Sequence, residues 1–131
     1  MSLLLLDTTF LIDAERSETA LDEAIDDDDD VAVAAVTVAE LLVGVALADD
    51  RLRPGRQAFV DSVVQAVPVL PYDLRVARAH AHLLAAARRS GTPRGAHDLI
   101  IAATAVSSQR IVVTADATGF HSLPGVQVVQ H

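Results

Sequence analysis

The sequence predicts an α/β fold around a mainly parallel central sheet of about four to five strands. Short apolar runs alternate with longer helical patterns along the chain, which is the order expected of strands joined by crossover helices. The 131 residues fit one domain spanning residues 1–131, and a hydrophobic content of 51% is enough for a sizeable core. Because aromatic residues make up only 3%, that core should consist of Ala, Val and Leu.

The first half of the chain contains two predicted strands, each followed by a helix. Ser2–Asp7 is a short apolar run that ends in Asp, and Thr8–Ile12 leads into a polar helical stretch. Val31–Val36 is the second predicted strand. The following helix, Thr37–Ala48, is apolar almost all round, which is typical of a helix that is buried on more than one side or covers a partner.

The second half continues the alternation after a polar break at residues 49–55. Two prolines place the third strand toward a sheet edge, because proline cannot donate to a strand ladder. The predicted elements are a helix at Gln57–Ala66, a strand at Val67–Leu70, a helix at Asp73–Arg89 ended by Gly91 and Pro93, a helix at Ala96–Gln109, a strand at Arg110–Thr114, a loop at Asp116–Gly125 and a strand at Val126–Val129.

Composition excludes several classes of site. No cysteine is present, which excludes disulfides, thiolate zinc sites and cysteine nucleophiles and fits a reducing compartment. All ten basic residues are arginines, whereas P-loop NTPases, response-regulator receivers and haloacid-dehalogenase phosphatases normally need a lysine near phosphate. The apolar run Leu3–Leu6 is too short for a signal peptide or a membrane span, so we expect a cytoplasmic location.

Charge is distributed unevenly along the chain. The formal net charge of −8 argues against a broad basic face for nucleic acid. The arginines do gather in two short stretches that could guide an RNA backbone, namely Arg51, Arg53 and Arg56, and Arg88, Arg89 and Arg94. The five consecutive carboxylates of Asp26–Asp30 should form a solvated turn, because adjacent side chains point in different directions and cannot act as one chelating set.

Four other carboxylates are predicted to meet at one edge of the sheet. Asp7 and Asp116 follow strands directly, where ligands of open parallel sheets gather. Glu40 lies one turn into the helix after the second strand, and Asp98 lies near the start of the helix before the fourth. Carboxylates so placed repel one another unless a cation lies between them. Hard oxygen ligands without His or Cys at ligand spacing favour Mg²⁺ or Mn²⁺ over zinc.

Each of these acids also has a common structural explanation. Asp7 before two threonines could cap the following helix. The segment from Thr37 to Glu40 fits a capping box, in which the glutamate bonds back to the cap residue. Asp98 in a first helical turn is favoured by the helix dipole, and Asp116 is an ordinary turn residue. The grouping of all four is what favours a metal site.

The histidines contribute less to the prediction. His80 and His82 lie about 200° apart around a helix and cannot chelate one ion. His97 adjoins Asp98 and is interpreted as a residue at a helix start, although it could face the substrate.

At these acids the sequence resembles the PIN-domain nucleases and, within them, the VapC-type toxins of bacterial toxin–antitoxin pairs. The matching stretches are LLLLDTTFLID at 3–13, VTVAELLVG at 36–44, GTPRGAHDLIIAATA at 91–105 and RIVVTADATGF at 110–120. They keep the order and spacing of the family over essentially the whole chain. The resemblance implies a PIN-like α/β/α sandwich and a single PIN domain over residues 1–131.

The resemblance also implies roles for individual residues. The acidic metal-binding set would be Asp7, Glu40, Asp98 and Asp116, with Glu40 reaching the metal through water. Thr9 and Thr114 would orient ligands or metal-bound water, and Arg94 lies where such toxins often carry basic residues that contact substrate. One position departs from the pattern: Gly119 stands where many relatives carry a further Asp, so a second ion would be held weakly or by substrate.

We therefore expect a Mg²⁺- or Mn²⁺-dependent endoribonuclease toxin that hydrolyses RNA, such as tRNA or rRNA, to a 5′-phosphate and a 3′-hydroxyl. The resemblance implies a small VapB-like antitoxin whose C-terminal segment inserts near the active site, and a homodimer or a toxin–antitoxin hetero-oligomer. Two alternatives remain open: a DNA-directed nuclease on the same fold, and a non-catalytic PIN-like module that binds protein. Four intact acids disfavour the non-catalytic module.

Overall fold

Five parallel strands lie side by side in the order β3-β2-β1-β4-β5 in the computed structural model, which describes residues 1–17 and 20–131. β1 occupies the centre of the sheet, and β3 with its flanking prolines lies at an edge, as predicted. The strands are β1 Leu3–Leu6, β2 Asp30–Ala34, β3 Val69–Leu70, β4 Ile111–Thr114 and β5 Val128–Gln130.

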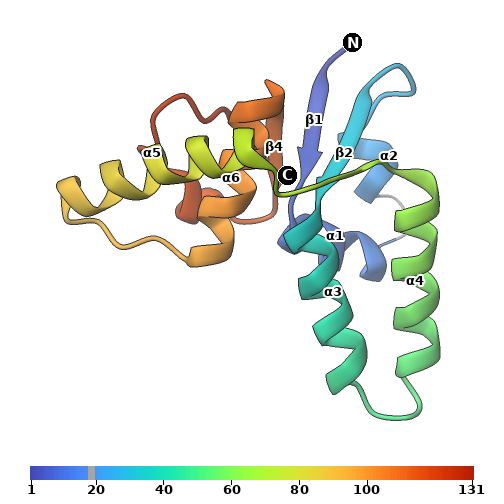
Figure 1. Cartoon of the computed structure of the whole chain (residues 1–131). Helices are drawn as coiled ribbons and strands as arrows, with labels where there is room; N and C mark the ends of the chain where they lie inside the picture. Colours follow the sequence, from blue (N-terminus) through green and yellow to red (C-terminus); the bar gives the residue numbers. More distant parts are fainter. Residues whose placement is uncertain (18–19) are drawn as a thin grey trace.

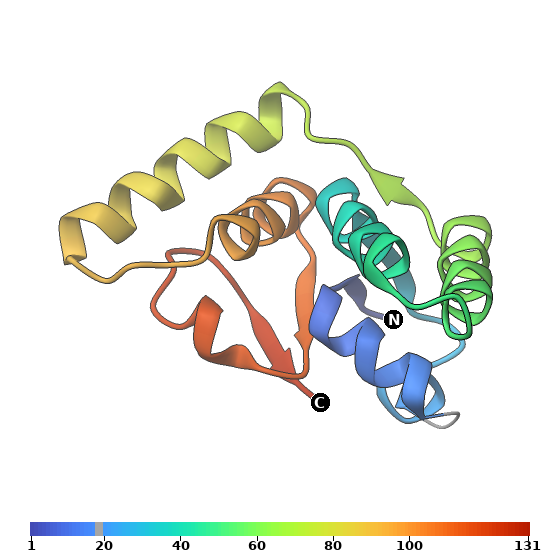
Figure 2. The same cartoon turned by 90° about the horizontal axis from the view of Figure 1, so that it is seen from below.

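Helices cover both faces of this sheet, so the predicted α/β/α sandwich is confirmed (Figures 1 and 2). The helices are α1 Thr8–Arg16, α2 Ala20–Ala24, α3 Ala35–Leu47, α4 Arg53–Ala66, α5 Leu74–Ser90, α6 Ala96–Ser108 and the 3₁₀ turn η1 Ala117–Phe120. α3 and α4 extend beyond the sheet as a helical pair (Figure 1). Within the described ranges, no helix is long and apolar enough to span a membrane.

Alternation along the strands assigns side chains to the two layers. Leu5 and Val112 point into the core shared with α5 and α6. Leu4, Leu6 and Val113 point into the opposite core, shared with α1, α3 and α4. Because successive side chains of a strand face opposite sides, such continuous apolar runs are required of strands that are covered on both faces. All five side chains are buried.

Two helices begin earlier than the sequence predicts. α3 begins at Ala35, so the last two residues of the predicted strand Val31–Val36 belong to the helix. α4 begins at Arg53, and the predicted polar break at 49–55 is therefore wrong for its last three residues. Pro54 lies in the first turn of α4, where a helix needs no backbone N–H, so this proline helps to start the helix rather than interrupt it.

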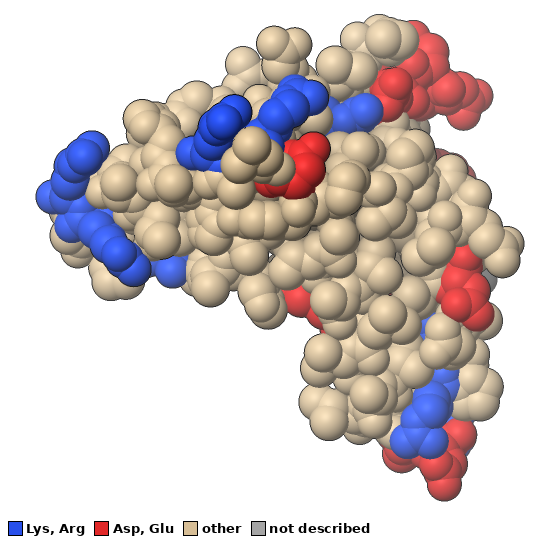
Figure 3. Space-filling view, viewed as in Figure 1, with Lys and Arg blue, Asp and Glu red and all other residues tan. Residues whose placement is uncertain are grey.

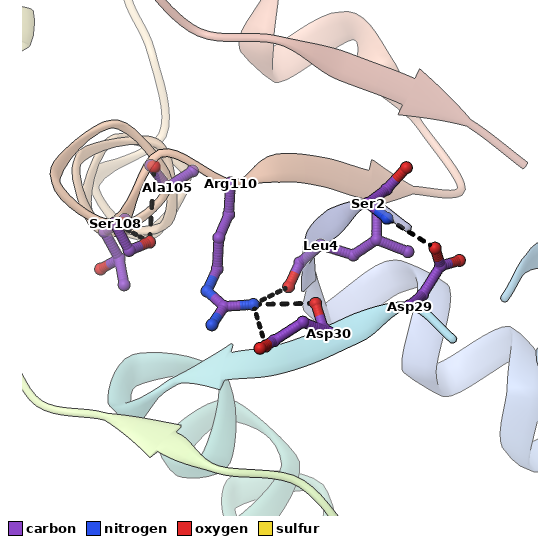
Figure 4. A network of polar contacts seen from close by, with 8 residues as sticks. Ser2, Leu4, Asp29, Asp30, Ala105, Ser108 and Arg110 are labelled. Carbon is purple, nitrogen blue, oxygen red and sulfur yellow. Dashed lines mark hydrogen bonds and ion pairs between the residues drawn. The ribbon is translucent and has the colours of Figure 1, made fainter. Parts of the chain in front are cut away.

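The amino-terminal edge of the sheet is held by Arg110, which precedes β4 (Figure 4). Its Nη1 donates to the carbonyl oxygen of Leu4 at 3.2 Å, to that of Asp30 at 2.8 Å and to the Asp30 carboxylate at 2.8 Å. One side chain thus joins the starts of β4, β1 and β2. Its buried Nε has no hydrogen-bond partner among residues 1–17 and 20–131, which offsets part of the stabilisation.

Candidate active site

The opposite, carboxyl-terminal edge of the sheet brings the four predicted acids together. Asp7 directly follows β1, and Asp116 follows the end of β4. Glu40 lies in the second turn of α3, and Asp98 lies in the first turn of α6. The charges of the other three all act on Asp98. The four acids therefore lie at the same edge of the sheet, and in the described residues no three of them bring carboxylate oxygens within 4.8 Å of one another.

Asp7 is the buried acid of the group, with a side chain only 2% exposed. Its Oδ2 accepts a hydrogen bond of 2.5 Å from the Thr114 hydroxyl, and its Oδ1 accepts bonds from the Thr9 hydroxyl at 3.0 Å and the Phe10 amide at 2.9 Å. The bond to Phe10 caps α1, so the expected capping role is realised alongside the position at the site. Burial raises the pKa of Asp7, and these hydrogen bonds partly oppose the rise.

Asp98 is half-buried and faces the other acids. Its pKa is raised first by burial and then by the negative charges of Asp7, Glu40 and Asp116. Its carboxylate also lies against the backbone of the η1 turn: a Cβ built on Gly119 would come within 2.3 Å of Asp98 Oδ2. The absence of a side chain at position 119 therefore makes room for the Asp98 carboxylate.

Glu40 is held by two partners that the sequence analysis did not assign to it. The Thr8 hydroxyl donates to Oε1 at 2.7 Å, and His97 Nδ1 lies 3.2 Å from Oε2. The alternative explanation of Glu40 as part of a capping box is wrong, because α3 begins at Ala35 with Ala34 as its N-cap, and Thr37 is a buried residue inside the helix. The Glu40 side chain is consequently directed to the site by tertiary contacts rather than to its own helix start.

Asp116 is the exposed acid of the group, and hydrogen bonds to residues close to it in sequence orient its carboxylate. The pKa of Asp116 is lowered by hydrogen bonds from the Thr118 side chain and backbone, and the backbone amide donates at 3.0 Å to Oδ1. Thr114 links this acid to the buried one: its hydroxyl accepts from the Asp116 amide at 3.1 Å and donates to Asp7. Thr9 likewise donates to Asp7 and accepts from the Ala115 amide at 3.2 Å. Both threonines therefore fix carboxylate orientation.

Arg94 is predicted to contact substrate, and in the structure its guanidinium donates hydrogen bonds to two nearby backbone carbonyls. Nη1 donates to the Thr118 carbonyl at 3.0 Å and Nη2 to the His121 carbonyl. These bonds tie the loop before α6, the helix of Asp98, to the segment that contains Gly119. In the structure Arg94 therefore holds together two segments that line the site.

Thr8 and His97 are the two site residues that the sequence analysis underused. Thr8 lies between Asp7 and Thr9, which the sequence analysis singled out, but its contact with Glu40 spans 32 residues and has no local signal. His97 was assigned to a helix start, and nothing in the sequence reveals that α6 begins beside Glu40. The contact depends on the packing of α3 against α6.

A second acidic group lies away from this site, within the run Asp26–Asp30. One carboxylate oxygen each from Asp26, Asp28 and Asp29 lie within 4.8 Å of one another, a spacing at which they could hold a cation. The run does form the predicted turn, but the prediction that its side chains cannot gather is wrong. Asp29 folds the turn back by accepting from the Asp26 and Ser2 amides, each at 2.9 Å. This group precedes β2, at the edge remote from Asp7.

A PIN domain model matches residues 4–125, so the fold and its acidic edge define a PIN-domain protein. The chain is 40% identical over 126 residues to Ribonuclease VapC5 of Mycobacterium tuberculosis, covering 95% of this chain and 90% of that protein. It is 33% identical over 97 residues to the tRNA(fMet)-specific endonuclease VapC of Salmonella typhimurium, covering 73% of this chain and 71% of that protein.

The solved structures include a similar chain in the VapBC-5 toxin–antitoxin complex from Mycobacterium tuberculosis. The two chains superpose with a TM-score of 0.83 over 100% of each and are 34% identical. The chain therefore belongs to the PIN-domain family and, within it, to the VapC group of toxin–antitoxin proteins.

Proposed function

We propose that this chain is a divalent-cation-dependent endoribonuclease that acts as the toxin of a VapBC pair. The observation that carries the proposal is Asp98, a half-buried carboxylate whose pKa is raised first by burial and then by the charges of Asp7, Glu40 and Asp116. Similar VapC proteins are named as ribonucleases, which supports the same reaction class. The proposal places the protein in the cytoplasm, where its RNA substrates would be.

The donor set fits a hard divalent cation. Asp7, Asp98 and Asp116 would hold Mg²⁺, or Mn²⁺ as an alternative, and Glu40 would bind it through water. Four carboxylates gathered at one edge repel one another, and a cation would relieve that repulsion. The threonine bonds to Asp7 fix the orientation of its two oxygens.

The proposed reaction is hydrolysis of an RNA phosphodiester that leaves a 5′-phosphate and a 3′-hydroxyl. When bound, the cation would supply a Lewis acid that lowers the pKa of water and offsets the charge developing on phosphate. Glu40 is fixed by Thr8 and His97 at the margin of the group, where it would orient the attacking water. Arg94 would help to position Asp98, because its hydrogen bond to the Thr118 carbonyl holds the loop before α6 in place. A direct contact between Arg94 and the substrate remains a prediction.

One cation is held by the chain itself in this proposal. Gly119 contributes no ligand, and its backbone lies against the Asp98 carboxylate. A second ion would depend on oxygen atoms of the substrate.

A structured RNA such as tRNA or rRNA is the proposed substrate. The relative from Salmonella typhimurium is named as a tRNA(fMet)-specific endonuclease, which favours tRNA as the first substrate to test. A DNA-directed nuclease on the same fold remains the alternative, together with a non-catalytic module that binds protein.

A VapB-like antitoxin is the proposed partner, since similar chains occur in VapBC complexes. A groove of about 400 Å³ between α1, α3 and α4 is one place where its C-terminal segment would fit. Glu40 contributes to this groove, so a segment bound there would reach the acidic group. An antitoxin arginine could pair with those carboxylates in place of the cation.

The test is a brief expression of the chain and of its Asp98→Asn variant, followed by sequencing of new RNA 5′ ends. New ends and growth arrest are expected from the parent chain and not from the variant. Asp61→Asn, on the exposed surface of α4, removes one carboxylate charge elsewhere and should behave like the parent. Unchanged cleavage by Asp98→Asn would contradict the catalytic assignment.

A further inference from the structure

Helix α5 has a charge pattern unlike that of the rest of the chain. Its 17 residues, Leu74–Ser90, include four arginines and no aspartate or glutamate. The whole chain has 18 acidic residues and a formal net charge of −8. α5 is therefore a strongly basic element on an acidic protein.

Three of those arginines lie on one line along the helix. At about 100° per residue, Arg75, Arg78 and Arg89 fall within an arc of about 60°, and His82 falls inside the same arc. All four side chains are exposed, whereas Val76, on the opposite side, is buried in the core. With a rise of about 1.5 Å per residue, this α5 stripe extends over about 21 Å.

The charge of the α5 stripe is not neutralised by acids. No ion pair joins its arginines to a carboxylate within residues 1–17 and 20–131. Arg75 donates to the Ser107 carbonyl, which anchors one end of the stripe without removing its charge.

The basic stretches predicted from the sequence are different in this respect. Arg53 pairs with Asp50 and donates to backbone carbonyls, and Arg56 and Arg94 donate to carbonyls as well. Of the residues in those stretches, Arg89 belongs to the α5 stripe, and Arg88 lies about 100° around the helix from it.

The α5 stripe runs to the carboxyl-terminal end of α5, which is an outer tip of the molecule, away from the sheet (Figure 1). Its Arg89 end is one residue from the last residue of α5, and a short loop from there starts α6, which contains Asp98. The Thr92 amide donates to the Ala87 carbonyl, so this loop begins folded against α5. Figure 3 shows basic side chains at the tip where α5 ends and over its first turns, with an acidic group beside those of the first turns.

We propose that the α5 stripe binds the phosphate backbone of the RNA, away from the acidic site at which the strand is cut. The proposal rests on the ribonuclease function proposed above. RNA is the occupant favoured by charge, because a protein with a net negative charge needs a local basic surface to hold a polyanion. Arginine suits this contact, since its guanidinium binds phosphate oxygens in pairs.

The experiment measures RNA binding in the Asp98→Asn background, which should bind without cutting. The probe is an unstructured, fluorescently labelled oligoribonucleotide long enough to span α5, and anisotropy is recorded at several salt concentrations. Arg78→Gln, Arg89→Gln and the double variant are compared with Arg51→Gln. Arg51 is likewise an exposed arginine, but it lies in the turn between α3 and α4, in the first of the two stretches that the sequence analysis proposed for RNA, so it compares that location with the α5 stripe.

The double variant is expected to bind the RNA roughly tenfold more weakly. Its plot of log affinity against log salt concentration should have a slope shallower by about 1.4, because two phosphate contacts are lost and each contributes about 0.7 for single-stranded nucleic acid. Arg51→Gln should bind like the Asp98→Asn parent. Equal binding by all variants, or an equal loss in Arg51→Gln, would overturn the proposal.

Two further measurements test whether DNA or a second copy of this chain binds the α5 stripe instead of RNA. Tighter stripe-dependent binding of the DNA of the same sequence would overturn RNA as the occupant. A change in oligomeric state of the double variant in sedimentation, with RNA binding unchanged, would instead assign the stripe to contact between copies of this chain. Cleavage by the Asp98→Asn parent would refute the proposed catalytic site and leave the binding comparison intact, so the two failures are distinguishable.

Discussion

Gly119 has no side chain, and this leaves the space that the Asp98 carboxylate occupies. A Cβ at position 119 would lie 2.3 Å from Asp98 Oδ2 and 3.0 Å from its Cγ. A side chain at this position would require the Asp98 carboxylate to lie elsewhere. In this chain the space is taken by Asp98 itself, which is consistent with a site centred on one cation.

Gly119→Ala is expected to displace the Asp98 carboxylate and lower the rate of RNA cleavage by on the order of a hundredfold, since small misplacements of a catalytic group cost about that much. Affinity for Mn²⁺, measured by calorimetry, should fall in the same variant. Gly55→Ala is the matched control, because a Cβ at Gly55 meets nothing within 4 Å. Full activity of Gly119→Ala would show that Asp98 adjusts freely.

The raised pKa of Asp98 makes the metal-free protein sensitive to pH. An acid whose pKa is higher in the folded than in the unfolded protein lowers the stability of the fold at any pH above its pKa in the unfolded protein. Well below that pKa the acid is protonated in both the folded and the unfolded protein, and the effect disappears. Asp98→Asn should therefore raise the Tm of the metal-free protein at neutral pH. The gain should vanish as the pH falls below the ordinary carboxyl range.

Calorimetric unfolding in the presence of a chelator, as a function of pH, measures this effect. Asp116→Asn provides the opposite case, because local hydrogen bonds lower the pKa of Asp116 and its charged form favours folding. An unchanged Tm for Asp98→Asn at neutral pH would mean that the neighbouring charges cost little in the folded state.

At the scale of elements, Arg110 ties three strand starts together at the edge remote from the site. Arg110→Met keeps the length of the side chain but leaves the Leu4 carbonyl and the Asp30 carboxylate without this donor. The expected cost is about 2 kcal/mol in the free energy of unfolding, the usual scale for hydrogen bonds to a charged group. Urea denaturation measures it.

Arg51→Met is the control for Arg110→Met, since the exposed Arg51 should tolerate the change within about 0.5 kcal/mol. A cost for Arg110→Met no larger than that of the control would mean that the unpartnered Nε cancels the benefit of the other bonds.

Element boundaries near the site were decided by packing. The apolar run before Thr37 suits a strand and a buried helix equally, and α3 takes its last two residues because the strand ends where β2 ceases to pair. That shift places Thr37 inside the helix, where it cannot form a capping box, and frees Glu40 for Thr8 and His97.

For the whole molecule, the four acids come from distant parts of the chain, so a cation held by them binds only the folded state. Mn²⁺ at about 100 times its Kd should stabilise the protein by about 2.7 kcal/mol, seen as a rise in Tm that a chelator reverses. Asp98→Asn should lose most of this rise. Asp26→Asn/Asp28→Asn should keep it, because that acidic turn lies at the other edge of the sheet. The reverse result would assign the principal metal site to the turn.

The order of strands and helices could be predicted from the sequence, because the periodicity of apolar residues and the Gly and Pro residues that end helices and strands are local signals. The four acids could also be chosen in advance, since two follow strands directly and the parallel sheet directs helix starts to the same edge. Gly91, with φ of 68°, ends α5 where the sequence places it.

Only the tertiary structure decided which side chains these acids contact. Asp7 meets Thr114 across 107 residues and Glu40 meets Thr8 across 32, and no local pattern specifies such pairs. The same holds for the basic residues: sequence clustering pointed to stretches whose arginines largely turned to backbone carbonyls, while helical geometry aligned Arg75, Arg78 and Arg89. Local propensity thus determined the elements, and packing determined which surfaces and side chains they present to one another.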